Sequence, residues 1–513
     1  MGDFLGNYTH TGNDFTGSDI GMLFLIAVVS TLLLGSTFLD LYLKIKKRVA
    51  DKHGKYALMT SFSLQKNGNT LLNTRTTADT ITCLFGLRFL SMAWIILGHT
   101  FYMKAISPSV NQEAIIEYDP NASSMLLLNA TVSTDTFLLL SGTLLSHIFL
   151  RKWNDRPTLN VYKFYLLRYI RLTPPYAFVI FFYATLMYHL GSGPLWDVQV
   201  GYNKQLCMEN WWTNLLYLNN YINVDKMCMN QTWYLAVDMQ LFWFSPIFLY
   251  TLVKWPRYGR MLLGFGIATS IIIPFAITLA LGLPPAMLYT KDEEGLGKVY
   301  VQIYTRTYAR AGPYLIGISL GYLLHKWKKN IKLDKKYVAL GWLGSLIICL
   351  SVLLGVAVFY DSEHGYNAFE SSVYAALHRS AWALGVAWVI FACAKGYGDP
   401  VNKFLSWKFF FPLSRLTYCA YLCHYIVLLY NIGSMKIRIY VTGYSVLQEF
   451  WANLIFSFLL ATIVYLAFEE PFRNLSFALL RKSPDVFEKE RRDSERKYND
   501  NILIGKNKTS PYV

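Results

Sequence analysis

Charged side chains are scarce in this sequence. They make up 16% of its 513 residues, whereas 54% of the residues are hydrophobic and 16% are aromatic. Soluble domains carry about a quarter charged residues, so this composition excludes an ordinary soluble protein. It indicates a protein that crosses a membrane several times.

The sequence also lacks the common signatures of metal and nucleophile sites. It contains no HExxH segment and no pair of CxxC motifs, and Cys419 and Cys423 lie four residues apart without a second pair. No metal site is therefore expected. Because neither a GxSxG motif nor a glycine-rich phosphate loop occurs, acid–base chemistry by histidine is the catalytic chemistry that remains.

Long apolar runs are what the sequence has in abundance. A run of about 20 apolar residues is enough to cross a bilayer as a helix. We expect an all-α bundle of eleven such spans, at residues 20–43, 84–104, 124–150, 174–191, 233–253, 261–282, 308–325, 337–359, 373–394, 410–432 and 447–468.

The net charge of +16 comes from short basic clusters between these runs. A nucleic-acid-binding protein would need one contiguous basic face, so nucleic acid is not an expected partner. Every second connection is basic, beginning with KIKKR after the first run. Because basic loops stay in the cytoplasm, we expect the N-terminus outside or in a lumen and the C-terminus in the cytoplasm. The membrane would be the plasma membrane or an endomembrane.

Three sequons and two cysteines lie on segments that are expected outside. Asn7, Asn121 and Asn230 each begin an Asn-x-Ser/Thr sequon and are expected glycosylation sites. Cys207 and Cys228 share one outside loop, where an oxidising compartment permits a disulfide.

The segments outside the spans are short. Residues 1–19 are expected to form an extracellular stub before the first span at 20–43, and residues 44–82 a polar cytoplasmic linker. The cytoplasmic tail at 474–513 mixes charges without an apolar face in its distal part, which is typical of a disordered or peripheral segment.

Arg88 and His99 lie eleven residues apart within one apolar run. On a helix this spacing places both side chains on one face, with roughly 16 Å between them. Ionisable residues at membrane depth usually face a bundle interior or a watery cavity, so the pair is a functional-site hypothesis. The alternative is structural: Arg88 reaches the membrane interface and His99 is a hydrogen-bonded core residue.

Other polar residues recur inside the predicted spans. Asp135 and Ser141 enter the third span, and Asp238 lies about one turn into the fifth. A carboxylate there must be protonated or paired with a cation, and Arg306 and Arg310 are the candidates.

Two further clusters carry alternatives of their own. Arg168 and Arg171 are three residues apart and would share a helix face suited to phosphate, although they could equally contact lipid headgroups. Tyr421 and His424 belong to a stripe of polar residues with helical spacing, which suits either a hydrated cavity or an ordinary bundle core.

Taken together, these residues resemble the membrane acyltransferase-3 family, and in particular its animal branch of nose resistant to fluoxetine-like proteins. The resemblance covers residues 83–473. It rests on the order and spacing of the motifs LFGLRFLSMAWIILGHT, STDTFLLLSG, LLRYIRLTPPY, QTWYLAVDMQLFWFSP, RTYARAGPYLIG, LTYCAYLCHY and FEEPFR.

The resemblance implies ten core spans that transfer an acyl group from cytoplasmic acyl-CoA, for example acetyl-CoA, to a carbohydrate or lipid acceptor. No permanently bound cofactor is implied. Arg88 and His99 match the functional pair of the family. Two departures stand out: Asp238 replaces the usual glutamate after Trp-Tyr-Leu, and no cysteine-rich extracellular domain precedes the first span, as in a short or partial form.

We expect His99 to act as the base, or as an acyl carrier, with Arg88 orienting the donor. Arg168 and Arg171 would hold the phosphates of acyl-CoA. The supporting network would comprise Asp135, Ser141, Trp233, Asp238, Arg306, Arg310, Tyr421 and His424. The rival hypothesis is a non-catalytic transporter of lipids or small molecules, because intramembrane ionisable residues also form transport pathways.

Overall fold

Helices account for the regular structure of this chain. The computed structural model describes residues 14–46, 55–77, 80–111, 122–155, 159–288, 292–327, 333–361 and 363–480. Within these ranges no strand forms, and the β interactions are limited to one isolated bridge between Ser109 and Ile439. The expectation of an all-α polytopic membrane protein is confirmed.

Each of the eleven predicted spans corresponds to a helix. The long helices are α1 (Gly17–Ile45), α4 (Cys83–Ile106), α7 (Ser133–Asp155), α8 (Val161–Ala184), α10 (Trp233–Lys254), α11 (Pro256–Leu281), α13 (Thr307–Lys326), α14 (Lys335–Gly355), α15 (Ala368–Lys395), α17 (Phe410–Gly433) and α18 (Gly443–Val464). In the described part of the chain, nine are long and apolar enough to cross a membrane, and α8 and α13 are the two others.

Shorter helices connect them. They are α2 (Lys55–Met59), α3 (Leu64–Leu72), α6 (Ala122–Leu128), η1 (Ala130–Val132), η2 (Leu186–Leu190), η3 (Asp197–Gly201), α9 (Tyr202–Leu215), η4 (Val224–Lys226), η5 (Asn230–Thr232), α12 (Glu293–Val299), η6 (Tyr300–Tyr304), η7 (Val356–Tyr360), α16 (Asp399–Leu405), η8 (Tyr465–Glu469) and α19 (Glu470–Leu480). The expected disulfide joins Cys207 of α9 to Cys228.

The boundaries of α8 differ from the predicted span at 174–191. The helix begins earlier, at Val161, and ends at Ala184. Its first half carries Arg168 and Arg171 among aromatic and aliphatic residues. Long basic side chains can extend their apolar stems along a helix and keep the charge at the interface, so this segment is helix rather than loop.

The chain divides into two compact units. The first comprises Met1–Leu25, Leu71–Val161 and Pro175–Tyr465, and the second Ile26–Thr70, Tyr162–Pro174 and Leu466–Val513. Most of the predicted polar linker falls in the second unit, where α2 and α3 form within it. There the Ser63 hydroxyl donates to Asp40 at 2.9 Å and the Asn474 amide donates to Asn67 at 3.1 Å.

In the first unit, α7 and α13 pack along each other at very close range. A Cβ atom on Gly142 would lie 2.2 Å from the Tyr314 carbonyl oxygen, and one on Gly317 would lie 2.3 Å from that of Leu139. Gly321, one turn beyond Gly317, has the same restriction. Small residues four apart let two helix backbones touch, which drives helix association in membranes.

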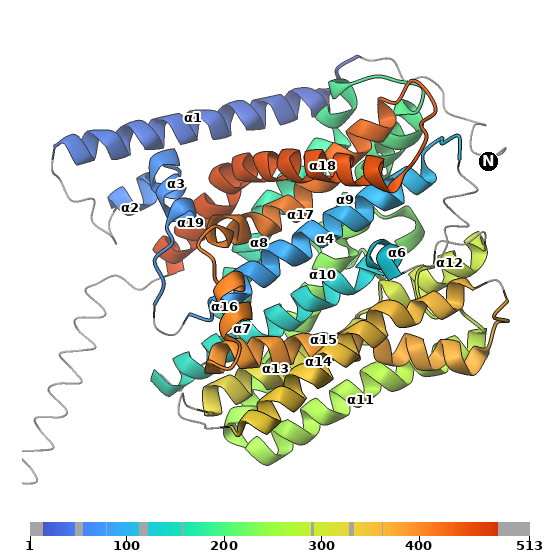
Figure 1. Cartoon of the computed structure of the whole chain (residues 1–513). Helices are drawn as coiled ribbons and strands as arrows, with labels where there is room; N and C mark the ends of the chain where they lie inside the picture. Colours follow the sequence, from blue (N-terminus) through green and yellow to red (C-terminus); the bar gives the residue numbers. More distant parts are fainter. Residues whose placement is uncertain are drawn as a thin grey trace, which may run out of the picture. The chain divides into compact units, whose positions relative to one another are not determined.

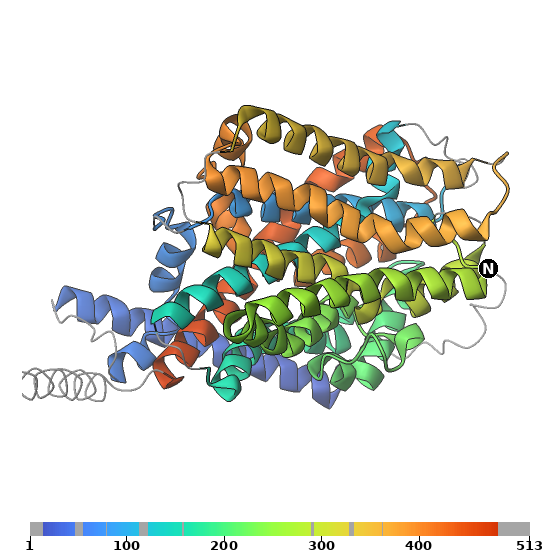
Figure 2. The ribbon, with the colours of Figure 1, turned by 90° about the horizontal axis from the view of Figure 1, so that it is seen from below.

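Helix α13 of this pair also belongs to a group of neighbouring helices in the same unit. Figures 1 and 2 show α11, α13, α14 and α15 running alongside one another, and α15 contacts each of the other three. Their outward residues are largely apolar. α14, for example, is predominantly exposed along its spanning part.

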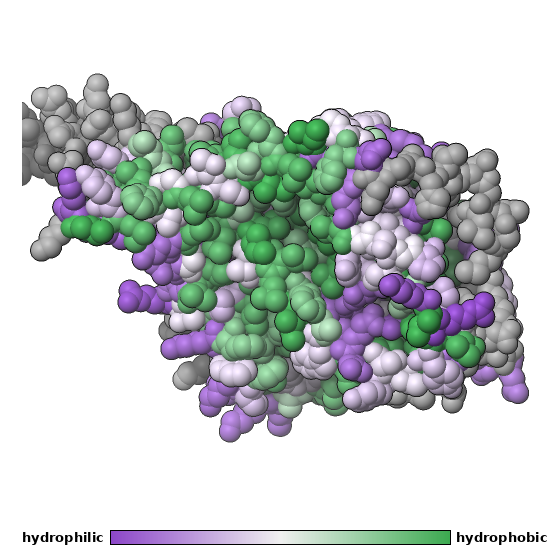
Figure 3. Space-filling view, turned by 90° about the horizontal axis from the view of Figure 1, so that it is seen from above, coloured by the Kyte–Doolittle hydropathy of each residue, from purple (hydrophilic) through white to green (hydrophobic). Residues whose placement is uncertain are grey.

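The outer surface has the hydropathy pattern of a membrane protein. Figure 3 shows a broad hydrophobic zone with hydrophilic residues toward either side of it. On α18 the large side chains of Trp451, Ile455, Phe456 and Ile463 are more than half exposed. Exposed apolar side chains in such number are stable against lipid tails and not against water.

Candidate functional site

Two histidines that are 325 residues apart in the sequence meet inside the first unit. His99 Nδ1 of α4 lies 2.8 Å from His424 Nε2 of α17, and the two rings are stacked with centroids 5.0 Å apart. His424 is completely buried, whereas His99 is partly exposed. Tyr425 packs edge-on against both rings. The sequence predicted both histidines as site residues and did not predict their contact.

The hydrogen bonds of His424 decide the tautomers of the neutral pair. His424 Nδ1 lies 2.8 Å from the Tyr421 carbonyl oxygen, which can only accept a hydrogen bond, so Nδ1 carries the proton. His424 Nε2 then accepts the proton of His99 Nδ1. The unprotonated nitrogen of His99 is therefore Nε2, the atom that a general base uses to remove a proton.

His99 lines a cavity of about 190 Å³, which we call the histidine cavity. Its walls are mostly apolar and aromatic. The described residues that line it are Ile95, Gly98, His99, Tyr102, Leu127, Leu128, Ala130, Thr131, Ser133, Thr134, Asn230, Gln231, Trp233, Met287, Leu288, Leu296, Tyr300, Tyr304 and Tyr425. None of these described residues is an acid, a lysine or an arginine.

Tyr300 and Tyr304, which lie in the connection between α12 and α13, form part of this wall. Burial raises the pKa of both phenols above the usual range. Both are therefore neutral at physiological pH. Tyr300 donates its hydroxyl proton to Asn230.

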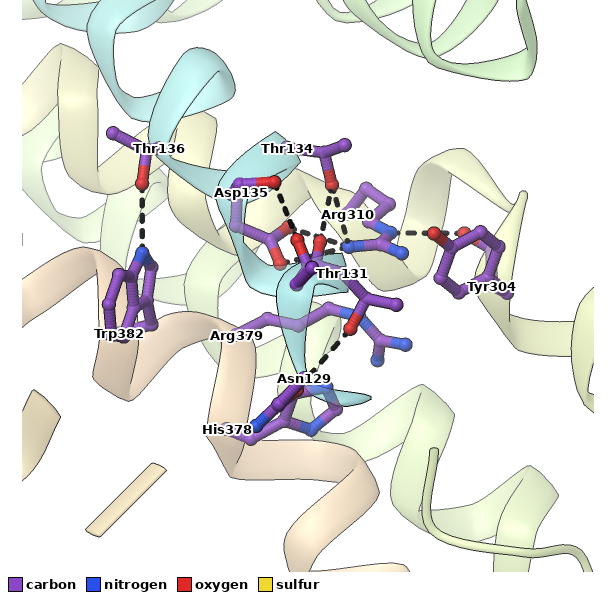
Figure 4. Close-up of polar contacts among 12 residues, drawn as sticks. Asn129, Thr131, Thr134, Asp135, Thr136, Tyr304, Arg310, His378, Arg379 and Trp382 are labelled. Carbon is purple, nitrogen blue, oxygen red and sulfur yellow. Dashed lines mark hydrogen bonds and ion pairs between the residues drawn. The ribbon is translucent and has the colours of Figure 1, made fainter. Parts of the chain in front are cut away.

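A buried ion pair, drawn in Figure 4, contacts residues of this wall. Arg310 Nη1 of α13 donates to both carboxylate oxygens of Asp135 of α7 at 2.9 Å, and both side chains are 1% exposed. The guanidinium also lies 4.8 Å from the ring centroid of Trp233 and 4.6 Å from that of Tyr304. The ion pair therefore supports two aromatic side chains of the histidine cavity by cation–π contact.

Figure 4 also shows polar groups around this ion pair that the sequence analysis had not singled out. The Trp382 indole donates to Thr136 at 2.8 Å, and Arg379, which is 3% exposed, donates to the Ala375 carbonyl at 3.2 Å. Arg379 lies within the predicted span 373–394, and an arginine inside a span is a signal that could have identified it.

The other two members of the predicted charge network have different partners. Arg306 donates to the backbone carbonyls of Val301 and Asn220, at 2.6 and 2.9 Å. Asp238 accepts a hydrogen bond from Ser141 at 2.7 Å. The expected pairing of a carboxylate with Arg310 thus occurs at Asp135, whereas Arg306 uses carbonyl dipoles because it lies at the N-terminal end of α13 beside them.

Arg88, which lies on the same helix as His99, lines a second and separate cavity. This basic cavity of about 340 Å³ contains Arg88 of α4 together with His147, Arg151 and Lys152 of α7. Arg151 and Lys152 directly follow the predicted span 124–150 and were not among the predicted site residues. The four-residue spacing of His147 and Arg151, which places them on one helix face, was the signal that could have identified them.

Arg168 and Arg171 belong to the second unit. Arg171 is half exposed and contacts Glu469 at 3.5 Å. A carboxylate partner in the same unit competes with an external phosphate for this guanidinium.

The remaining predicted residues either line or adjoin the histidine cavity or lie outside the described ranges. Asn230 is exposed and lines that cavity, and it follows the disulfide at Cys228 closely. Asn7 and Asn121 lie outside the described residues. Tyr421 donates its hydroxyl proton to the Gln231 carbonyl and holds η5 against α17.

Comparison with known proteins agrees with this architecture. A family model for an acyltransferase domain matches residues 81–470. Nose resistant to fluoxetine protein 6 of Caenorhabditis elegans is 32% identical over 489 residues, which cover 88% of this chain and 58% of that protein. No solved structure matches the chain.

Two further relatives are more distant. Regulator of hypoxia-inducible factor 1 of Caenorhabditis elegans is 26% identical over 450 residues, covering 82% of this chain and 84% of that protein. A protein of Staphylococcus aureus (strain COL) that is named as an O-acetyltransferase is 23% identical over 371 residues, covering 70% of this chain and 55% of that protein. The family match over most of the chain and the first relative together establish that this chain belongs to the acyltransferase 3 family of membrane proteins.

Proposed function

We propose that this chain is an integral membrane O-acyltransferase that moves an acyl group from acyl-CoA to a hydroxyl of an acceptor. The observation that carries the proposal is His99, which lines a cavity and is held in one tautomer by the buried His424. A positioned imidazole with a free Nε2 is the group that hydroxyl activation requires.

In the proposed reaction the acceptor hydroxyl attacks the thioester carbonyl carbon. The new C–O bond forms, the hydroxyl proton passes to His99 Nε2, and the C–S bond breaks. The same proton then goes to the leaving thiolate, which departs as CoA. His424 acts through His99, because it fixes the ring orientation and stabilises the imidazolium that forms.

The developing oxyanion needs a hydrogen-bond donor. We assign this role to the side-chain amide of Gln231, which is 3% exposed and lines the histidine cavity. An amide N–H in a water-poor site stabilises negative charge by donating a hydrogen bond, and it keeps its proton.

The phosphates of acyl-CoA require several cations in one place. The basic cavity offers Arg88, Arg151 and Lys152, and fork-shaped guanidinium groups bind phosphate oxygens in pairs. Arg168 and Arg171, which belong to the second unit, remain predicted acyl-CoA contacts in their own right. Since Arg88 and His99 are roughly 16 Å apart along α4, an extended donor would place its phosphates and its thioester at different ends of one helix.

The test is transfer from radiolabelled acetyl-CoA by the purified full chain in lipid nanodiscs, with a cell extract as the source of acceptor. We expect label in the acceptor fraction together with free CoA. Calorimetry should show that Arg151→Ala weakens CoA binding by roughly 1.5–3 kcal/mol, the worth of one charge-assisted contact. Arg257→Ala, which removes an exposed arginine elsewhere, is the matched control. A chain that neither binds CoA nor transfers label would contradict the proposal and favour the alternative, a non-catalytic lipid or small-molecule transporter.

A further inference from the structure

The histidine cavity has a chemical character that bears on the acceptor. Its described lining includes the aliphatic side chains of Ile95, Leu127, Leu128, Met287, Leu288 and Leu296. A ligand that fills this space is stabilised when it buries apolar surface against these walls.

Four hydroxyl groups of the described cavity wall already donate hydrogen bonds within the protein. Thr131 donates to Asn129, Ser133 to the Ala130 carbonyl, and Thr134 to the Thr131 carbonyl. Tyr300 donates to Asn230. A hydroxyl that already donates within the protein has no second proton to offer a ligand.

This wall offers few hydrogen-bond partners to a carbohydrate. Each of its many hydroxyls would leave water, and each one without a partner would weaken binding considerably. The described lining residues contain no acid, lysine or arginine that could hold two neighbouring hydroxyls at once. His99 Nε2 and the Gln231 amide serve one hydroxyl and one carbonyl oxygen.

From this geometry we infer that the acceptor is an apolar alcohol, with a single hydroxyl on an aliphatic or aromatic body, and not a carbohydrate. The inference rests on the proposed function for its chemistry, since the hydroxyl must reach His99. The reaction would then convert a lipid-like alcohol and acyl-CoA into an ester and CoA.

The experiment compares two acceptors with the purified full chain in nanodiscs and radiolabelled acetyl-CoA. Dodecanol represents the apolar alcohols and methyl β-glucoside the carbohydrates. We expect dodecyl acetate and no acetylated glucoside. Acetylation of the glucoside in preference to dodecanol would overturn the inference and leave the proposed function standing.

Binding is measured separately with a dodecanol that carries a photoreactive diazirine. The probe should label peptides of α12 and η6, and excess dodecanol should prevent labelling. Leu296→Asp should reduce labelling about tenfold or more, because the contact of one partly buried leucine is lost and a charge enters the wall. Gly297→Asp, one residue further and in open space, should label like the unmodified chain.

Two outcomes separate this inference from the proposed function. Labelling of the cavity peptides without any acetyl transfer would support an apolar alcohol as the ligand and contradict the proposed acyltransferase reaction. Labelling that misses these peptides, or that Leu296→Asp leaves unchanged, would overturn the ligand class.

Discussion

His99 has an imidazole partner where many catalytic histidines have a carboxylate. His424 donates to a backbone carbonyl and accepts from His99, so it orients the ring as a carboxylate would but brings no negative charge. Such a partner can hold the tautomer while contributing less to stabilising the imidazolium. The two histidines are therefore expected to differ in how strongly each affects the rate.

His99→Gln should lower acyl transfer by about 10²–10⁴-fold, because glutamine keeps hydrogen bonding but cannot carry a proton at neutral pH. His424→Gln should lower the rate less, and its pH profile should shift, since both the positioning of His99 and the stabilisation of its imidazolium are disturbed. The readout is initial rate against pH with radiolabelled acetyl-CoA. His325→Gln, in a histidine that bonds Asn154 away from the cavity, serves as control. Near-normal transfer by His99→Gln would make this residue structural.

The ion pair of Asp135 and Arg310 should govern stability. Arg310→Met leaves the buried carboxylate without its cation and should destabilise the fold by about 3–5 kcal/mol. The double variant with Asp135→Leu should recover most of this loss, because no buried charge remains. Thermal unfolding of purified single and double variants gives the coupling energy. Equal Tm values for the unmodified chain and for Arg310→Met would rule out this view of the pair.

At the residue scale, the sequence identified which side chains are unusual and offered Arg306 and Arg310 as cations for the carboxylates, but it did not identify which residues meet. His99, His424, Asp135 and Arg310 were all predicted as site residues because polar groups are costly in a membrane. Their partners depend on how α4 packs on α17 and α7 on α13, and no local pattern records that packing.

At the scale of the helices, the contact of α7 with α13 is set by glycine. Gly317→Val should disrupt this packing, since even the first added carbon would overlap the Leu139 carbonyl. We expect a lower Tm and a loss of monodisperse protein in fluorescence-detected size-exclusion chromatography. Gly344→Val on α14, where a Cβ atom meets nothing within 4 Å, is the matched control. Indistinguishable profiles for the two variants would contradict a close contact.

Helix prediction succeeded where apolarity and length agreed and was less accurate where arginine interrupted the run. Hydropathy located all eleven long helices, yet the boundaries of α8 were shifted because Arg168 and Arg171 interrupt the apolar run. Likewise, α2 and α3 were missed within the predicted polar linker. A short helix with little apolar surface has no periodic signal strong enough to separate it from a loop.

At the scale of the whole molecule, topology remains a prediction from the basic loops. An epitope tag at the C-terminus should be reached by antibody only after cells are permeabilised. Glycosidase should increase electrophoretic mobility, and the shift should depend on Asn121 or Asn230. Staining of the tag on intact cells would reverse the orientation.

The pairing of Asp135 with Arg310 also has a consequence for how the protein is made. The two residues are separated by 175 positions, and ribosomes add about 5–20 residues per second. The third predicted span therefore enters the bilayer roughly 10–35 s before its cation exists. During that interval the carboxylate must stay protonated or be shielded, which makes the nascent chain dependent on the insertion machinery until α13 arrives.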